Sequence, residues 1–68
     1  GVLSPRQRQV AALAAGGSRN AEIAASVGLS VKTVEHHLAE ALHRLGLPSR
    51  AGLATVVFGP GEPGDAGF

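Results

Sequence analysis

The sequence lacks cysteine, tryptophan and tyrosine, and Phe58 and Phe68 are its only phenylalanines. Without cysteine it can form neither a disulfide nor a thiolate metal site, so its stability must come from packed helices, helix caps or a partner. So few aromatic rings leave it without the usual wall of a ligand pocket and without the stacking platform that binds single-stranded nucleic acid. Binding to duplex DNA requires neither feature.

Long apolar runs are also absent. No run approaches the roughly 18 residues that span a bilayer, and no charged start followed by an apolar stretch indicates a secretory signal. We therefore expect a cytoplasmic protein without membrane contact.

The 68 residues permit one domain. Because a domain of about 60 residues buries only about 60% of its unfolded surface, a catalytic pocket would be hard to fit. We expect no enzyme activity and no cofactor, and Gly1 in place of methionine suggests a piece of a longer protein.

The last ten residues differ in composition from the rest. Residues 59–68 read GPGEPGDAGF, and glycine and proline at this density favour a disordered tail or spacer. We therefore predict a domain over residues 1–58 and a flexible tail over residues 59–68. The domain holds six basic against three acidic residues, an excess of three positive charges. This excess suits a polyanionic partner, although ordinary surface charge explains it equally well.

Helix signals begin at Ser4, which can cap a helix, followed by Pro5 at the first helical position and Gln7 as a capping-box partner. Gly16 and Gly17 can end the helix, so we predict one from about Pro5 to Ala15. Its apolar stripe consists of Val10, Leu13 and Ala14.

A short second helix follows, with Asn20 or Ser18 as its cap, Gly28 as its end, and Ile23, Ala24 and Val27 facing inward. Only Leu29 separates Gly28 from Ser30, the next cap. Two helices joined by so short a turn must cross steeply, as in a helix-turn-helix unit. Such corners also occur in proteins that do not bind DNA.

The third predicted helix, from Val31 to about Leu45, has two distinct faces. Steps of about 100° per residue place on one side Val34, Leu38, Ala41, Leu42 and Leu45. The opposite side holds Lys32, His36, Ala39, Glu40 and His43. This polar row can reach base edges, although a solvated amphipathic face has the same pattern. After Gly46 and Pro48, Ser49 can cap a fourth helix from Arg50 to about Phe58, which completes an all-α, four-helix fold.

From Leu3 to about Phe58 the sequence resembles, without a gap, the LuxR-type or GerE-type helix-turn-helix domain. The resemblance rests on EIA, LS, TV and LG-x-x-SR at fixed spacing. The matching residues are Leu3, Pro5, Arg6, Val10, Leu13, Gly17, Asn20, Glu22, Ile23, Ala24, Leu29, Ser30, Thr33, Val34, His37, Leu45, Gly46, Ser49, Arg50 and Leu53. It implies the C-terminal DNA-binding domain of a transcription regulator, such as a NarL/FixJ-like response regulator, a quorum sensor or a large ATP-binding activator.

The resemblance also implies site residues. The base-reading positions of the family correspond to Glu35, His36 and Ala39. A glutamate can accept from cytosine N4, and an alanine methyl can pack on thymine. Helix starts and the polar face supply the expected phosphate contacts, which are Arg19, Asn20, Ser30, Lys32, Thr33 and His43. A weak homodimer is expected through the fourth helix, by way of Ala51, Ala54 and Phe58, while Leu53 and Val57 point the other way.

Three positions depart from the family pattern. Arg19 stands where a serine or threonine cap is common, so capping must move to a neighbour while the guanidinium gains access to phosphate. Gln7 replaces a common acid and keeps its reach-back hydrogen bond without the charge. Glu35 replaces a common Lys or Arg, which lowers nonspecific attraction to DNA. His37 matches a family histidine and is interpreted as a packing residue at the edge of the core.

Three alternatives compete with this interpretation. A promoter-recognition module of the sigma-factor type has the same turn and would also contact RNA polymerase, but it lacks a counterpart of LGLPSRAGLATVVF. A protein-interaction module would use the fourth helix, with Glu35 and Glu40 repelling DNA. A metal site is least expected, because His36 and Glu40 share one face but have no third ligand nearby.

Overall fold

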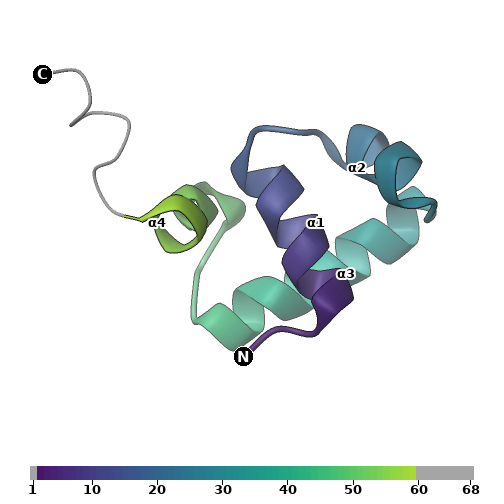
Figure 1. Cartoon of the computed structure of the whole chain (residues 1–68). Coiled ribbons are helices and arrows are strands. Elements are labelled where there is room, and N and C mark those ends of the chain that lie inside the picture. Colours follow the sequence, from purple (N-terminus) through teal and green to yellow (C-terminus); the bar gives the residue numbers. More distant parts are fainter. Residues whose placement is uncertain (1, 60–68) are drawn as a thin grey trace, which may run out of the picture.

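The computed structural model describes residues 2–59. These residues form α1 (Pro5–Ala15), α2 (Asn20–Val27), α3 (Val31–Leu45), a 3-10 turn η1 (Arg50–Gly52) and α4 (Leu53–Phe58) (Figure 1). No strand occurs among the described residues, which confirms the predicted all-α fold with four helices. The predicted tail lies, from residue 60 onward, outside the described residues. No helix in residues 2–59 has the length and apolar character needed to cross a membrane.

The start of α1 is fixed by a reciprocal pair of hydrogen bonds. Ser4 Oγ accepts from the Gln7 backbone N–H at 3.1 Å, and Gln7 Oε1 accepts from the Ser4 backbone N–H at 3.1 Å. Two backbone donors that the helix leaves unpaired are thereby satisfied. This capping box explains why Gln7, although polar, is buried, and the predicted bounds of the helix are confirmed.

The cap of α2 differs from the prediction. Neither Ser18 nor Asn20 caps this helix, because Arg19 occupies the N-cap position and Asn20 is already helical. A guanidinium has no acceptor, so the Arg19 side chain cannot bond the exposed backbone N–H groups. Glu22 Oε1 instead accepts from the Arg19 backbone N–H at 2.7 Å, so a carboxylate of the first turn replaces the missing serine or threonine.

The turn between α2 and α3 depends on one glycine. Gly28 adopts a left-handed conformation with φ of 72°, and the Leu29 N–H donates to the Ala24 carbonyl at 3.0 Å. Two residues later, Ser30 Oγ accepts from the Thr33 backbone N–H at 3.1 Å and caps α3. The predicted tight turn and the predicted start of α3 are thus confirmed.

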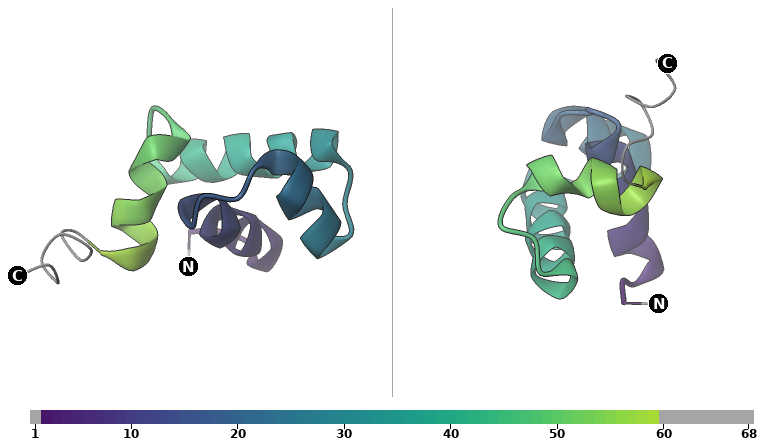
Figure 2. Two further views of the ribbon diagram at one scale, coloured as in Figure 1. Left: turned by 90° about the horizontal axis from the view of Figure 1, so that it is seen from above. Right: turned by 90° about the vertical axis from the view of Figure 1, so that its left-hand side faces the viewer.

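The core lies between α1, α2 and α3 and is closed by the start of α4. α2 and α4 lie near opposite ends of α3, and α1 packs across its middle (Figures 1 and 2). Small side chains allow these helices to approach closely. The buried apolar residues are Val10, Ala11, Ala14, Ile23, Ala24, Val34, Leu38, Ala41 and Leu53.

The fourth helix is shorter than predicted. Arg50–Gly52 form a 3-10 turn, the α-helix begins only at Leu53, and the Ser49 side chain makes no capping hydrogen bond. Gly52 packs so closely against Leu47 that an added Cβ would lie 3.0 Å from Leu47 Cδ2. Glycine inside an α-helix costs about 1 kcal/mol relative to alanine, so the α-helix gains little by extending through this position.

Candidate nucleic-acid interface

The outward face of α3 collects most of the polar residues that the sequence singled out. Glu35, His36 and Ala39 are exposed on this face, and Ala39 is a neighbour of both others because it lies four residues after Glu35 and three after His36. Lys32 and His43 extend the same exposed surface toward the two ends of the helix. Since Val34, Leu38 and Ala41 are buried on the opposite side, packing fixes the direction in which this polar face points.

The histidines of α3 are not equivalent. His36 is exposed, whereas His37 is half-buried against the body of the domain. Their ring centroids lie 6.0 Å apart, with the ring planes tilted by 59°. Only His36 of this pair therefore presents its ring nitrogens fully to a ligand on the outward face.

At the start of α3, Ser30 and Thr33 bond to each other as well as to the backbone. Ser30 Oγ donates to Thr33 Oγ1 at 2.9 Å while it accepts from the Thr33 N–H. The hydroxyl proton of Ser30 is thereby engaged within the cap. The hydroxyl proton of Thr33 is the one left to donate to an external acceptor such as a phosphate oxygen.

The start of α2 carries a contact that the sequence did not indicate. Asn20 Oδ1 accepts from Arg50 Nη1 at 2.9 Å, and Arg50 Nη2 donates to the Ser18 carbonyl at 2.8 Å. Arg19, between these two acceptors in the chain, is exposed. Arg50 lies thirty residues beyond Asn20, so no periodicity or local spacing could have paired them. The match of Arg50 to the LuxR-type SR motif was the one available signal.

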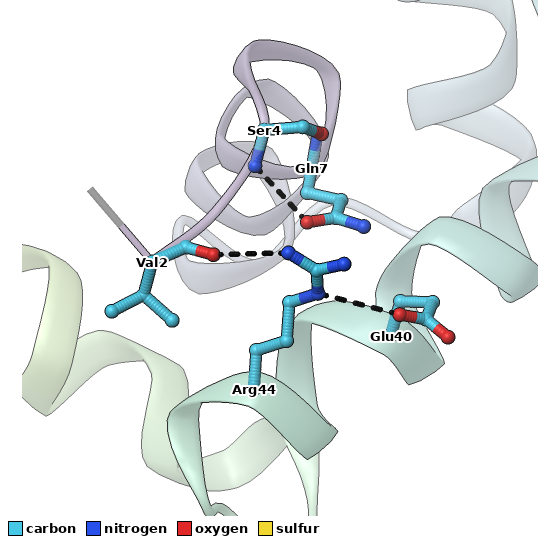
Figure 3. A network of polar contacts seen from close by, with 5 residues as sticks. All are labelled: Val2, Ser4, Gln7, Glu40 and Arg44. Carbon is cyan, nitrogen blue, oxygen red and sulfur yellow. Dashed lines mark hydrogen bonds and ion pairs between the residues drawn. The ribbon is translucent and has the colours of Figure 1, made fainter.

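Half of the basic residues are engaged inside the domain. Arg6 Nη1 donates to the Val27 carbonyl at 3.2 Å, and Arg50 holds the entry of α2. Arg44 Nε lies 3.4 Å from Glu40 Oε1, and its Nη1 donates to the Val2 carbonyl at 3.3 Å, so Arg44 joins α3 to the segment before α1 (Figure 3). The same contact partly neutralises Glu40, which weakens its expected repulsion of DNA.

The other basic side chains are Arg8, Arg19 and Lys32, all exposed and without hydrogen bonds to other side chains or carbonyls in residues 2–59. Arg19 precedes α2 and Lys32 lies in the first turn of α3. Arg8 instead lies on α1, where it borders an apolar groove together with Leu45, Val56 and Val57. Two of the three thus stand near the helix starts where phosphate contacts were predicted.

The surface of α4 is more apolar than predicted. Ala51, Ala54 and Phe58 are exposed, and 55% of Phe58 is accessible to solvent. Val57 was expected to face the core beside Leu53, but it is 38% exposed, whereas Leu53 is fully buried. The α-helix begins at Leu53 and has only six residues, and Val57 lines the groove beside Arg8, Ala11 and Ala12 of α1.

Two capped helices joined by a left-handed glycine, with a polar face on the second of them, define a helix-turn-helix domain. Residues 1–57 match the family model of the luxR family of bacterial regulatory proteins, the GerE domain. The chain belongs to this family and is a DNA-binding domain of transcription regulation, not an enzyme.

Two curated relatives agree with this assignment. The transcriptional regulatory protein UhpA of Salmonella typhimurium is 46% identical over 56 residues, which cover 82% of this chain and 29% of UhpA. Rv0890c of Mycobacterium tuberculosis, named as an HTH-type transcriptional regulator, is 38% identical over 63 residues, or 93% of this chain and 7% of that protein. The chain therefore spans less than a third of either relative. No solved structure matches it significantly.

Proposed function

We propose that the domain binds duplex DNA in a sequence-specific manner, with α3 in the major groove as the recognition helix. The observation that carries this proposal is the outward face of α3, which is exposed and, apart from Val31 at the start of the helix, free of bulky apolar side chains, while the opposite face packs into the core. The major groove is about 12 Å wide and admits an α-helix. A helix whose rotation is fixed by packing presents the same side chains to every site it meets.

Glu35, His36 and Ala39 contact base edges in this proposal. Glu35 accepts from the N4 amino group of cytosine, and the Ala39 methyl packs on a thymine methyl. His36 offers ring nitrogens to either donors or acceptors. All three are exposed on one face of α3, which supports their acting together within a few base pairs.

Phosphate contacts come from the helix starts and from the ends of the exposed face. Backbone N–H groups at a helix N-terminus attract anions, and cations placed there add to this attraction. Arg19 and Lys32 supply the charge and the Thr33 hydroxyl supplies a donor. The full set consists of Arg19, Asn20, Ser30, Lys32, Thr33 and His43.

A homodimer through α4 would place two recognition helices on one face of the DNA. The exposed Ala51, Ala54 and Phe58, together with Val56 and Val57, form an apolar surface at the end of the domain. A two-fold axis through this surface gives paired half-sites about one helical turn apart.

The salt dependence of binding tests this interface. Lys32→Ala should reduce the slope of log affinity against log salt by roughly one per protomer, because one phosphate contact is lost. Arg8→Ala removes the same charge from the α1 side of the domain, and we expect it to leave the slope unchanged. Both are measured by mobility shift on mixed-sequence duplex, with single-stranded competitor. Equal slopes for the two variants, or full competition by single strands, would contradict the proposal.

A further inference from the structure

The guanidinium of Arg50 donates hydrogen bonds to two acceptors in the segment where α2 begins. Its Nη1 reaches Asn20 Oδ1 and its Nη2 reaches the Ser18 carbonyl, at 2.9 and 2.8 Å. Both distances are ordinary for N–H···O bonds, and a planar fork with two partners fixes orientation better than a single ammonium does. The two acceptors stand on either side of Arg19, so the contact orders the whole approach to the helix.

The segment that carries Arg50 is itself fixed to the core. Leu53, three residues later, is fully buried. Gly52 lies against the side chain of Leu47, with no room for a larger residue unless Leu47 moves. The Arg50 guanidinium therefore extends from a turn that is anchored to the core. Its hydrogen bonds fix the position of residues 18–20 relative to that core.

The chemistry of the contact determines which way the Asn20 amide faces. Arginine has only donors, so the Asn20 group that faces Arg50 must be the carbonyl oxygen. The Nδ2 group, with its two N–H donors, is left on the other side of the amide, and it makes no hydrogen bond within residues 2–59. A phosphate oxygen only accepts hydrogen bonds, so this is the orientation that suits a DNA backbone.

We propose that Arg50 is a positioning residue for DNA binding: it orients the Asn20 amide so that Nδ2 donates to a phosphate oxygen, without touching the DNA itself. The inference rests on the proposed duplex binding and assigns to Arg50 a role in that site. In helix-turn-helix proteins the helix before the recognition helix crosses the DNA backbone. A residue at the start of α2 is therefore placed to meet a phosphate when α3 lies in the groove.

The first test is a double-mutant cycle on mixed-sequence duplex, where phosphate contacts can be measured without knowledge of the operator. Arg50→Lys keeps the charge but replaces the rigid planar fork by an ammonium on a flexible stem, which orients the two acceptors less well, and we expect affinity to fall about three- to tenfold with an unchanged salt slope. In an Asn20→Ala background the same change should have no further effect. Arg44→Lys is the matched control, because Arg44 also binds a backbone carbonyl, at the segment before α1, and it should leave affinity unchanged.

Asn20→Asp provides a second test that does not alter Arg50. The aspartate keeps an oxygen for Arg50, so the free energy of unfolding should not fall, but it replaces the donor by a negative charge and should lower affinity more than about tenfold. Native affinity for Asn20→Asp would overturn the inference. So would an Arg50→Lys loss that persists in Asn20→Ala, since Arg50 would then act on DNA directly. If the native chain itself does not bind duplex, the proposed function fails first, and the two failures are thereby distinguished.

Discussion

At the scale of single residues, the proposed interface on α3 combines positions that we expect to contact bases with positions that we expect to contact the DNA backbone. Glu35 is the most informative of them, because a carboxylate near DNA is unfavourable unless a base donor satisfies it. Its neighbour in the first turn, Lys32, carries the opposite charge and lies closer to the helix start. The two side chains should therefore have different effects when they are removed.

We expect Glu35→Ala to change the preferred base at one operator position while hardly moving the salt slope. Loss of the carboxylate removes the acceptor for cytosine N4 and thus relaxes discrimination at that position, which typically amounts to about 1–3 kcal/mol. Selection from a random duplex library, followed by affinities for single-base variants over a salt series, measures both quantities. Lys32→Ala is the control, since it should weaken all sites alike. A uniform loss for Glu35→Ala would refute its assignment to base reading.

At the scale of elements, the turn between α2 and α3 determines how α3 is positioned relative to α2. Gly28 adopts φ of 72°, and an added Cβ there would meet no atom within 4 Å. Space is therefore available for a side chain, and the restriction comes from the backbone conformation alone. The left-handed conformation costs an L-residue about 1–2 kcal/mol of conformational free energy, and the cost is smaller for asparagine than for alanine.

Gly28→Ala should accordingly lower the free energy of unfolding by about 1–2 kcal/mol, and Gly28→Asn should lower it less. Urea denaturation followed by circular dichroism measures both. Gly16→Ala is the matched control, because Gly16 ends α1 with φ of −82°, outside the left-handed region, and an added Cβ there makes only ordinary contacts. Equal losses at positions 16 and 28 would show that the backbone conformation of Gly28 is not what matters.

Elements whose signals are local were predictable from the sequence. The Ser4 and Ser30 caps, the Gly28 turn and the buried stripe of α3 depend on residues within one or two helical turns, and all of them occur as expected. The features that the sequence did not predict depend on neighbours distant in the chain or on competition between caps. Glu22 replaced the expected caps of α2, and Arg50 paired with Asn20 across thirty residues.

The candidate site divides in the same way. Helical spacing placed His36 and Ala39 on one exposed face, as the structure has them, whereas Glu35 was named only through the resemblance to the family. The 3-10 turn and the exposure of Val57 could not be predicted from periodicity, because both depend on packing: Gly52 lies against Leu47, and Val57 lines the groove beside α1. Roles toward DNA for any of these residues stay predictions until binding is measured.

At the scale of the whole molecule, the apolar end formed by α4 is the feature that monomer packing leaves unexplained. Val56, Val57 and Phe58 are each exposed by more than a third, and adjacent apolar residues on a surface of this kind mark interaction sites more often than scattered ones do. A short helix of six residues offers a small interface, so we expect self-association to be weak in the absence of DNA.

Ala54→Glu should abolish this association, because it places a buried charge at the two-fold axis, opposite its own copy. Sedimentation equilibrium of the native domain and the variant measures it directly. Binding to DNA with two half-sites should weaken, while binding to a single half-site should not change. Gln9→Glu, exposed on α1 and not among the residues that line the groove, controls for added charge. If native and Ala54→Glu domains show the same monomer mass and the same affinity for two half-sites, the interface lies elsewhere or does not exist.

The small core has a consequence for how the domain responds to heat. Four of its nine buried apolar residues are alanines, so unfolding exposes little apolar surface per residue, and both the enthalpy and the heat-capacity change should be modest. At roughly 0.7 kcal/mol of enthalpy per residue, a domain of this size melts over a broad interval, and each kcal/mol of stabilisation moves the midpoint by about 4–8 °C. Bound DNA should therefore raise the melting temperature of the domain by several degrees for each kcal/mol of binding free energy that it adds. A thermal scan is thus a sensitive measure of operator binding.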